Sequence, residues 1–221
     1  MNEPGTMPTG DESEDERPST KRMTFPNPML VVVSGPSGVG KSTIVAELAR
    51  HRPQVVPIVT ATTRRQRENE IAGVHYHFLS EAEFADLIER RGLLEHANNH
   101  GNWYGTPVDQ VRGILAAGRD AILTISPEGA RNVRRQVPDA LLIFVMPPSL
   151  EDLDDRLRRR GSESEASLER RRRDAERWMA EAGDYDHVVV NETGRPEEAA
   201  EQIWEIIQAE ARRDPPRRPR V

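Results

Sequence analysis

The sequence of 221 residues contains no cysteine, which excludes a disulfide framework and any metal site built on thiolates. None of its apolar runs approaches the roughly 18 residues of a membrane-spanning helix. Its first residues are acidic and polar, which is not the form of a secretory signal peptide. We therefore expect a cytoplasmic protein with no membrane partner.

Lysine is also scarce, since Lys21 and Lys41 are the only two among 31 basic residues. Lys41 belongs to a run that fits G-x-x-x-x-G-K-[ST], the phosphate-binding loop, and that reads Gly35, Pro36, Ser37, Gly38, Val39, Gly40, Lys41 and Ser42. An apolar, β-branched run precedes it and a segment of helical periodicity follows it. In this context we expect the loop amides and the helix N-terminus to bind ATP phosphates, Lys41 to reach the β- and γ-phosphates, and Ser42 to hold Mg²⁺.

The formal net charge of −6 gives no indication of a nucleic-acid partner. Residues 1–28 are acidic and contain few apolar side chains, and residues 212–221 are basic and rich in proline. Neither composition can bury enough apolar surface to fold. We expect both ends to be disordered tails.

Between the tails, strand-like and helix-like segments alternate, which predicts a doubly wound α/β sheet. The expected strands are 29–34, 55–60, 74–79, 120–126, 140–146 and 187–191. The expected helices are 41–51, 80–91, 107–117, 127–136, 149–159, 164–182 and 195–212. Residues 60–106 break the alternation, because they are polar and loop-rich, and we interpret them as an insertion beside the nucleotide-binding core.

Several motifs of the insertion stand in a recognisable order. The first is Thr62-Thr63-Arg64-Arg65-Gln66-Arg67-Glu68-Asn69-Glu70, and Gly73-Val74-His75-Tyr76-His77-Phe78 follows. Leu94-Glu95 and Gly101-Asn102-Trp103-Tyr104-Gly105-Thr106 complete the series. Together with the phosphate loop, they resemble the guanylate kinase family over roughly residues 29–210.

The resemblance implies a P-loop NTPase-type fold with an inserted nucleoside-monophosphate-binding region and a helical lid. It implies transfer of the γ-phosphoryl group of ATP to GMP. The corresponding units are the guanylate kinase-like domain 29–211, the GMP-binding region 60–106 and the lid 156–180. The partners would be Mg²⁺-ATP and GMP, and we expect a monomer or a weak homo-oligomer.

The chemistry of the residues agrees with a nucleotide acceptor. Arg64 and Arg67 can present guanidinium groups to a dianionic phosphate, and Tyr76 and Tyr104 can donate hydroxyl hydrogen bonds. Guanine presents N1–H and N2–H₂ side by side, for which the carboxylate of Glu95 is a bidentate acceptor.

By resemblance, the substrate-binding residues are Thr60, Arg64, Arg67, Glu70, Tyr76, Glu95, Tyr104 and Thr106, with Thr106 at the O6 edge of the base. The resemblance implies catalytic roles for Lys41, Arg64, Arg160 and Arg171, the last two of which belong to the lid. It places Asn191 near the adenine of ATP.

The sequence departs from the family at one motif. The family carries D-[IV]-D where this chain has Thr124-Ile125-Ser126, so two carboxylates near the acceptor are replaced by hydroxyls. The substitution leaves two alternatives open. One is a P-loop kinase with another phosphorylated acceptor, and the other is a catalytically weakened guanylate-kinase-like binding module.

Overall fold

The computed structural model describes residues 27–99, 101–159 and 165–221. Its centre is a sheet of five strands in the order β2-β7-β1-β8-β9, and every pairing in it is parallel. The strands are β1 Leu30–Ser34, β2 Val55–Pro57, β7 Asp120–Thr124, β8 Leu141–Met146 and β9 His187–Val190. This doubly wound sheet confirms the fold class predicted from the alternation of segments.

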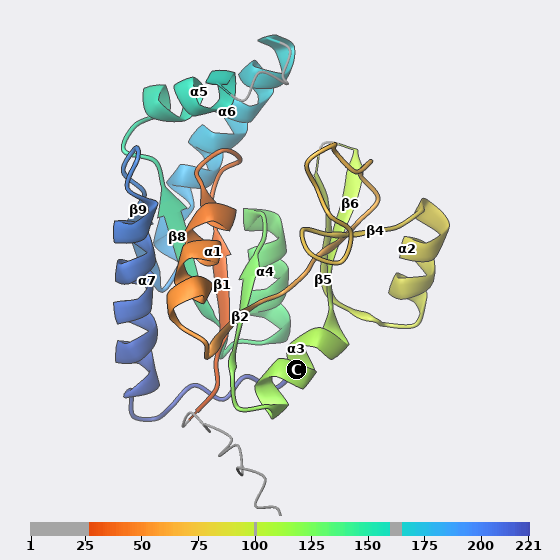
Figure 1. The fold of residues 1–221 in the computed structure, drawn as a ribbon, viewed down its shortest axis with the longest axis vertical. Helices are drawn as coiled ribbons and strands as arrows, with labels where there is room; N and C mark the ends of the chain where they lie inside the picture. Colours follow the sequence, from red (N-terminus) through yellow and green to blue (C-terminus); the bar gives the residue numbers. More distant parts are fainter. Residues whose placement is uncertain (1–26, 100, 160–164) are drawn as a thin grey trace, which may run out of the picture.

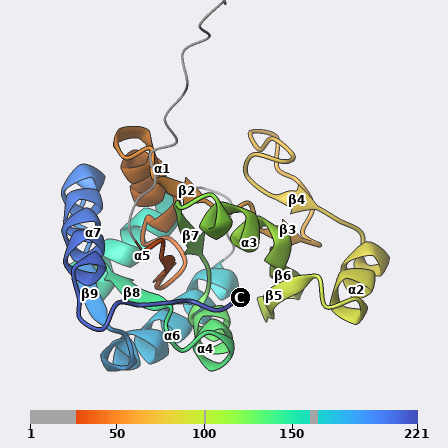
Figure 2. The same ribbon diagram turned by 90° about the horizontal axis from the view of Figure 1, so that it is seen from below.

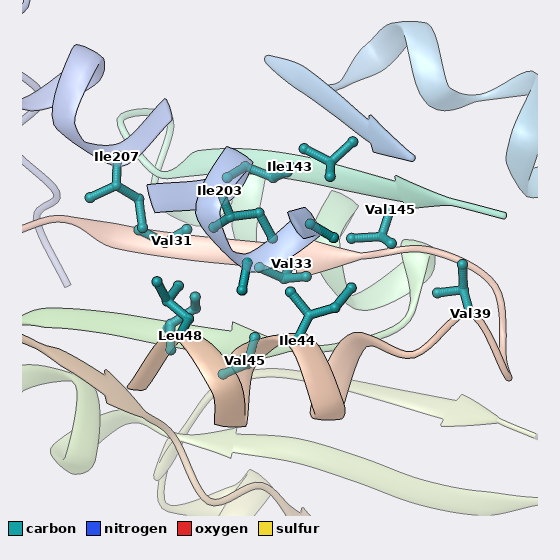
Figure 3. Packing of buried hydrophobic residues seen from close by; sticks show 14 of the residues in the cluster. Val31, Val33, Val39, Ile44, Val45, Leu48, Ile143, Val145, Ile203 and Ile207 are labelled. Atoms are coloured by element: carbon teal, nitrogen blue, oxygen red, sulfur yellow. The ribbon is translucent and has the colours of Figure 1, made fainter. Parts of the chain in front are cut away.

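Helices cover both faces of the parallel sheet (Figure 1). On one face lie α1 Lys41–His51 and α7 Pro196–Ala211, and on the other lie α3 Val108–Ala116 and α4 Pro127–Gln136. Figure 3 shows Val31 and Val33 of β1 packed against Ile44 of α1 and Ile203 of α7. The alternate residues of β1 face the opposite cluster, so the strand is buried on both sides. Each such side chain contributes about 1.5–3 kcal/mol of transfer free energy.

The region predicted to be a lid, 156–180, begins within α5 Leu150–Arg159, which lies beyond the carboxyl ends of the strands at the top of Figure 1. It continues in α6 Glu165–Ala180, which runs from there down beside β8, and the short helix η1 Ala182–Asp184 follows. Leu153 and Leu157 of α5 are buried in the main core, and Trp178 of α6 packs against Phe144 of β8. Arg160, the first of the two expected lid arginines, lies outside the described residues.

The region expected to be loop-rich contains a second sheet, with strand order β4-β3-β6-β5. Its strands are β3 Ala61–Thr62, β4 His77–Phe78, β5 Leu93–Asn99 and β6 Asn102–Pro107, and α2 Glu81–Glu89 lies at its side. The sequence reading missed β3, β5 and β6 and made the strand at 74–79 too long. The reason is that β5 and β6 carry polar side chains on the face that lines a cavity, so they lack an apolar alternation.

The helices agree closely with the sequence, because each of the seven predicted helices is present with ends within two residues. Their boundaries are set by local side chains. Ser80 and Glu83 form the predicted capping box of α2. Ser126 caps α4, accepting a 3.3 Å hydrogen bond from Gly129 N, and Pro127 stands at the first helical position.

The C-terminal segment differs from the disordered tail predicted for 212–221. It runs from α7 beneath the parallel sheet toward α3 and α4 (Figure 2). The Arg217 side chain is only 7% exposed and lies 2.7 Å from Glu210 and 3.5 Å from Asp186. The terminal Val221 packs on the core, and its carbonyl oxygen accepts a hydrogen bond from Arg112 Nε. Composition alone misled here, because one buried arginine with two acidic partners fixes a segment that has almost no apolar residues.

Among the residues that the structure describes, no helix is both long and apolar enough to span a membrane.

Candidate active site

The phosphate loop joins β1 to α1 and closes around the Lys41 ammonium group. Lys41 Nζ donates hydrogen bonds of 2.6 Å to Gly35 O and 2.9 Å to Pro36 O, so the loop carbonyls hold the cation beneath the loop. Gly40 precedes the helix with φ +100°, and a Cβ there would lie 2.5 Å from Asn191 Nδ2. Only glycine satisfies both conditions. The loop amides and the N-terminus of α1 can therefore surround an anion.

Side chains from the lid and from the end of β9 brace this loop. Asn191 Nδ2 donates to Val39 O at 2.7 Å, and Arg156 NH1 donates to the same oxygen at 3.3 Å. Arg156 NH2 also donates to Asn191 O at 2.7 Å. Arg171 of α6 donates to Ser37 Oγ on the loop itself. The lid guanidinium thus lies directly at the edge of the phosphate site.

Opposite the loop, a carboxylate holds the two predicted phosphate-binding arginines together. Arg64 NH2 donates to Glu70 Oε1 at 2.7 Å, and the Arg67 backbone N–H donates to Glu70 Oε2 at 2.9 Å. Burial opposes the charge on Glu70, but these hydrogen bonds and the charges of both arginines lower the pKa of its carboxyl group below the ordinary value. Arg64 also lies 5.3 Å from the ring centroid of Tyr76. Glu70 therefore orients the arginines.

The far end of the site is a buried carboxyl group. Glu95 of β5 is 3% exposed, and its Oε1 accepts a 2.7 Å hydrogen bond from the Thr106 hydroxyl of β6. Burial raises the pKa of Glu95 to about 7, against the opposing effect of the Thr106 hydrogen bond, and the nearby charge of Glu128 raises it further. Gly129 of α4 makes room for this group, since a Cβ there would lie 2.8 Å from Glu95 Oε2.

These parts face one cavity of about 310 Å³ between the two sheets and the lid. Most of the predicted site residues line it: Gly35, Ser37, Gly38, Gly40, Lys41, Ser42, Thr60, Arg64, Arg67, Glu70, Tyr76, Glu95, Tyr104 and Arg171. Four others, Pro36, Val39, Thr106 and Asn191, do not line it. Pro36 O accepts from Lys41, Val39 O accepts from the buried side chain of Asn191, and Thr106 is fully buried next to Glu95.

Comparison with known proteins identifies the family to which this chain belongs. The family model described as guanylate kinase matches residues 27–210. The chain belongs to the guanylate kinase family. It is 47% identical over 163 residues to the guanylate kinase of Synechococcus sp. (strain JA-3-3Ab), covering 74% of this chain and 75% of the relative.

Two further members of the guanylate kinase family extend the similarity. The guanylate kinase of Symbiobacterium thermophilum is 43% identical to this chain over 188 residues, covering 85% of this chain and 88% of the relative. The crystal structure of guanylate kinase from Anaplasma phagocytophilum superposes with a TM-score of 0.72 at 30% identity, covering 86% of this chain and 90% of that one.

The cavity of this guanylate kinase family member also contains lining residues that were not predicted as site residues. They are Thr43, Ala97, Asn99, Asn102, Leu157 and Trp178, together with Thr124, Ile125 and Ser126 of the motif that departs from the family. Asn99 Nδ2 donates to Ser126 Oγ at 3.3 Å, so a neutral pair bridges β5 and the N-terminus of α4. Asn102 stands in the G-N-x-Y-G motif, and this position was the available signal for it.

The acidic groups of the cavity are few. Glu70 and Glu95 are the only carboxylates among the described lining residues, and Glu70 is engaged by arginine. Elsewhere in the described chain no group of three or more His, Cys, Asp or Glu side chains could hold a metal ion. Near the loop, the side-chain oxygens that could coordinate a metal ion include the hydroxyls of Ser42 and Thr124. Neutral oxygens suit Mg²⁺ when phosphate groups supply most of the ligand charge.

Proposed function

We propose that this protein transfers the γ-phosphoryl group of ATP to GMP and releases ADP and GDP. The observation that carries the proposal is that one cavity joins the phosphate loop to a buried carboxyl group. Lys41 lies at one end, Glu95 at the other, and the Arg64–Arg67 pair between them. Two phosphorylated nucleotides placed end to end would bring a γ-phosphate toward an acceptor phosphate.

The base of the acceptor is selected by Glu95. Guanine presents two N–H donors on adjacent atoms, and an ionised carboxylate accepts both. The Thr106 hydroxyl holds one carboxylate oxygen in place at 2.7 Å. The Thr106 hydroxyl has one proton, which it donates to Glu95, so we propose that it acts on the base through this carboxylate and not by donating to O6.

The phosphate of the acceptor is held by Arg67 and Arg64, with hydroxyls of Tyr76 and Tyr104 in the same cavity. Glu70 neutralises part of the Arg64 charge and holds its guanidinium group near the Tyr76 ring. A fixed guanidinium loses little side-chain entropy on binding, so the phosphate meets a prepared site.

In phosphoryl transfer the protein mainly positions the two substrates and neutralises the charge on the transferred group. Lys41 and Arg171 approach the donor side, because both are anchored on the phosphate loop. Arg160 is proposed as a second lid cation. Ser42 would hold Mg²⁺ together with the ATP phosphates, and the ion would supply charge neutralisation at the transferred group.

Further parts of the proposal are a cytoplasmic location, where ATP is available, and a monomer or weak homo-oligomer without a nucleic-acid partner. The net charge of −6 is consistent with the last point, since a nucleic-acid partner would favour a basic chain. The phosphate loop with its lysine speaks against a binding module that lacks catalysis.

A second acceptor deserves a test because Thr124 and Ser126 bring no charge to the base pocket. The decisive experiment is a coupled assay of ADP release with GMP, dGMP, IMP, AMP, CMP and UMP. We expect GMP to have the highest kcat/KM. A folded protein that binds ATP but turns over none of the guanine nucleotides would refute the proposal.

A further inference from the structure

The chain passes between the two sheets at two places, and the first of them reaches the cavity. Residues 58–60 lead from β2 of the parallel sheet into β3 of the second sheet, and α3 leads back from β6 to β7. Ile58 N still donates to Ile122 O of β7 at 2.9 Å. Thr60, two residues later, already lines the cavity. Residue 59 is therefore the link between the two sheets at the first of these crossings.

One side chain joins these two crossings. The Gln110 amide on α3 accepts a 3.2 Å hydrogen bond from Val59 N and donates to Val59 O at 3.4 Å. Its nitrogen also lies 2.8 Å from His77 Nε2 of β4. The amide thus pairs with both backbone groups of residue 59, much as a neighbouring strand would.

The orientation of the amide follows from the backbone. Val59 N–H can only donate, so the oxygen of Gln110 must face it and the nitrogen must face His77. Since the amide nitrogen can only donate, His77 Nε2 must be the acceptor. His77 is then a neutral imidazole that carries its proton on Nδ1.

The groups that Gln110 holds are the immediate neighbours of cavity residues. Val59 precedes Thr60, and His77 follows Tyr76; both Thr60 and Tyr76 line the acceptor side. His77 N in turn donates to Thr60 O at 2.9 Å, so His77 is also tied directly to a residue that lines the cavity. We infer that Gln110 is a positioning residue for the phosphoryl acceptor, acting through Val59 and His77 on Thr60 and Tyr76.

The helix that carries Gln110 is a firm support. Val108 and Val111 of α3 are buried in the core of the parallel sheet, and Arg112 Nε donates to Val221 O at 3.2 Å. Gln110 therefore transmits the position of the nucleotide-binding core to the second sheet. The phosphate loop, where ATP would bind, is formed by other elements of the cavity, and none of its residues is hydrogen-bonded to Gln110 among the described contacts.

This role rests on GMP being the acceptor, as proposed above, and it is tested with Gln110→Ala. We expect the KM for GMP to rise about three- to tenfold, the size of one lost hydrogen bond, while the KM for ATP stays unchanged. Gln110→Glu keeps an oxygen for Val59 N, and its second oxygen can accept from His77 once that ring moves its proton to Nε2. This oxygen cannot donate to Val59 O, however, so we expect the variant to restore the affinity for GMP only in part.

The matched control is Asp109→Asn, one residue earlier on α3, whose side chain is 91% exposed. Nuclear magnetic resonance of isotope-labelled histidine supplies a readout that needs no substrate. In the wild type, His77 Nε2 should be unprotonated and Nδ1 protonated, and Gln110→Ala should give a mixture of the two tautomers.

Equal changes in both KM values, or a lower melting temperature with both KM values unchanged, would show that Gln110 only supports the fold. A proton on Nε2 in the wild type would also overturn the assignment. A wild type without activity on GMP would instead refute the proposed function, and this outcome is separate from those of the variants.

Discussion

The Thr106 hydroxyl donates a 2.7 Å hydrogen bond to Glu95 Oε1 across two antiparallel strands, at the closed end of the cavity. Both residues are buried, and the bond leaves Glu95 Oε2 beside Gly129 at the N-terminus of α4. The carboxyl group that we propose reads the base is thus held in position by a neighbouring side chain. This arrangement buries an acidic side chain, and the raised pKa of that side chain makes ligand binding and stability depend on pH.

Binding of GMP should depend on pH through Glu95. Burial raises the pKa of this carboxyl group to about 7, and only the ionised form accepts from both guanine donors. The KM for GMP should fall about fourfold between roughly pH 6.5 and pH 8, because the ionised fraction grows by about that factor. The KM for ATP serves as the control. A flat KM for GMP over this range would show that Glu95 is already ionised.

The stability of the fold should decrease over the same pH range in which GMP binding improves, because both depend on ionisation of Glu95. The pKa of Glu95 is about 7 in the folded protein against 4.5 for the free side chain, so the folded state binds the proton more tightly between these values. The free energy of unfolding should therefore decrease as the pH rises through this window. Glu95→Gln should flatten that dependence in denaturant titrations, and an unchanged slope would contradict the assignment.

Replacement of Lys41 by alanine should abolish phosphoryl transfer while the fold survives. The loop holds this ammonium by two carbonyl contacts, and loss of one preorganised charge lowers kcat by about a hundredfold or more. Lys41→Arg should also be poorly active, because a planar guanidinium does not replace a compact ammonium. Near wild-type kcat in either variant, with circular dichroism showing intact structure, would remove this loop from the donor site.

Substitution of either arginine that we propose binds the acceptor phosphate should raise the KM for GMP far more than the KM for ATP. A charge-assisted contact with phosphate contributes about 1.5–3 kcal/mol, so Arg64→Ala and Arg67→Ala should each raise the KM for GMP at least tenfold. Arg65→Ala is the matched control, because this neighbour is exposed and does not line the cavity. If the control and the two variants behaved alike, the arginines would not contact the phosphate.

The C-terminal segment should contribute to stability through Arg217. Arg217→Ala leaves Glu210 and Asp186 without their shared partner and should lower the free energy of unfolding by about 2–3 kcal/mol. In a chain of this size the melting temperature should fall by about 5–10 °C. Arg218→Ala, at the exposed next position, should have little effect. Equal melting temperatures for the two variants would mean that the segment is not docked.

The hydroxyls of Thr124 and Ser126 should weaken the choice between guanine and hypoxanthine. The double change Thr124→Asp with Ser126→Asp adds charged acceptors, and aspartate preserves the cap of α4 that Ser126 provides. The kcat/KM for GMP relative to IMP, which lacks the N2 amino group, should therefore rise. An unchanged ratio in an active double mutant would show that these positions do not read the base.

The sequence by itself determined the parts of this protein that depend on neighbouring residues. The phosphate loop could be located from Gly35 to Ser42 because its shape comes from backbone conformations that glycine allows. Helices such as α2 and α4 could be bounded because Ser80 and Ser126 satisfy amide groups only three residues away. Resemblance to the family motifs then identified cavity residues that lie within those motifs, such as Arg64 and Tyr104.

Tertiary structure decided whatever depends on partners that are distant along the chain. The Thr106 hydroxyl could have faced the base, and only the pairing of β5 with β6 directs it to Glu95. Arg217 is one of many arginines in the sequence, and its burial follows from acids at positions 186 and 210. Gln110 and His77 carry no local signal, because their contact exists only where α3 and β4 meet. A hydrogen bond between remote residues is set by packing of whole elements, and periodicity along the chain does not encode it.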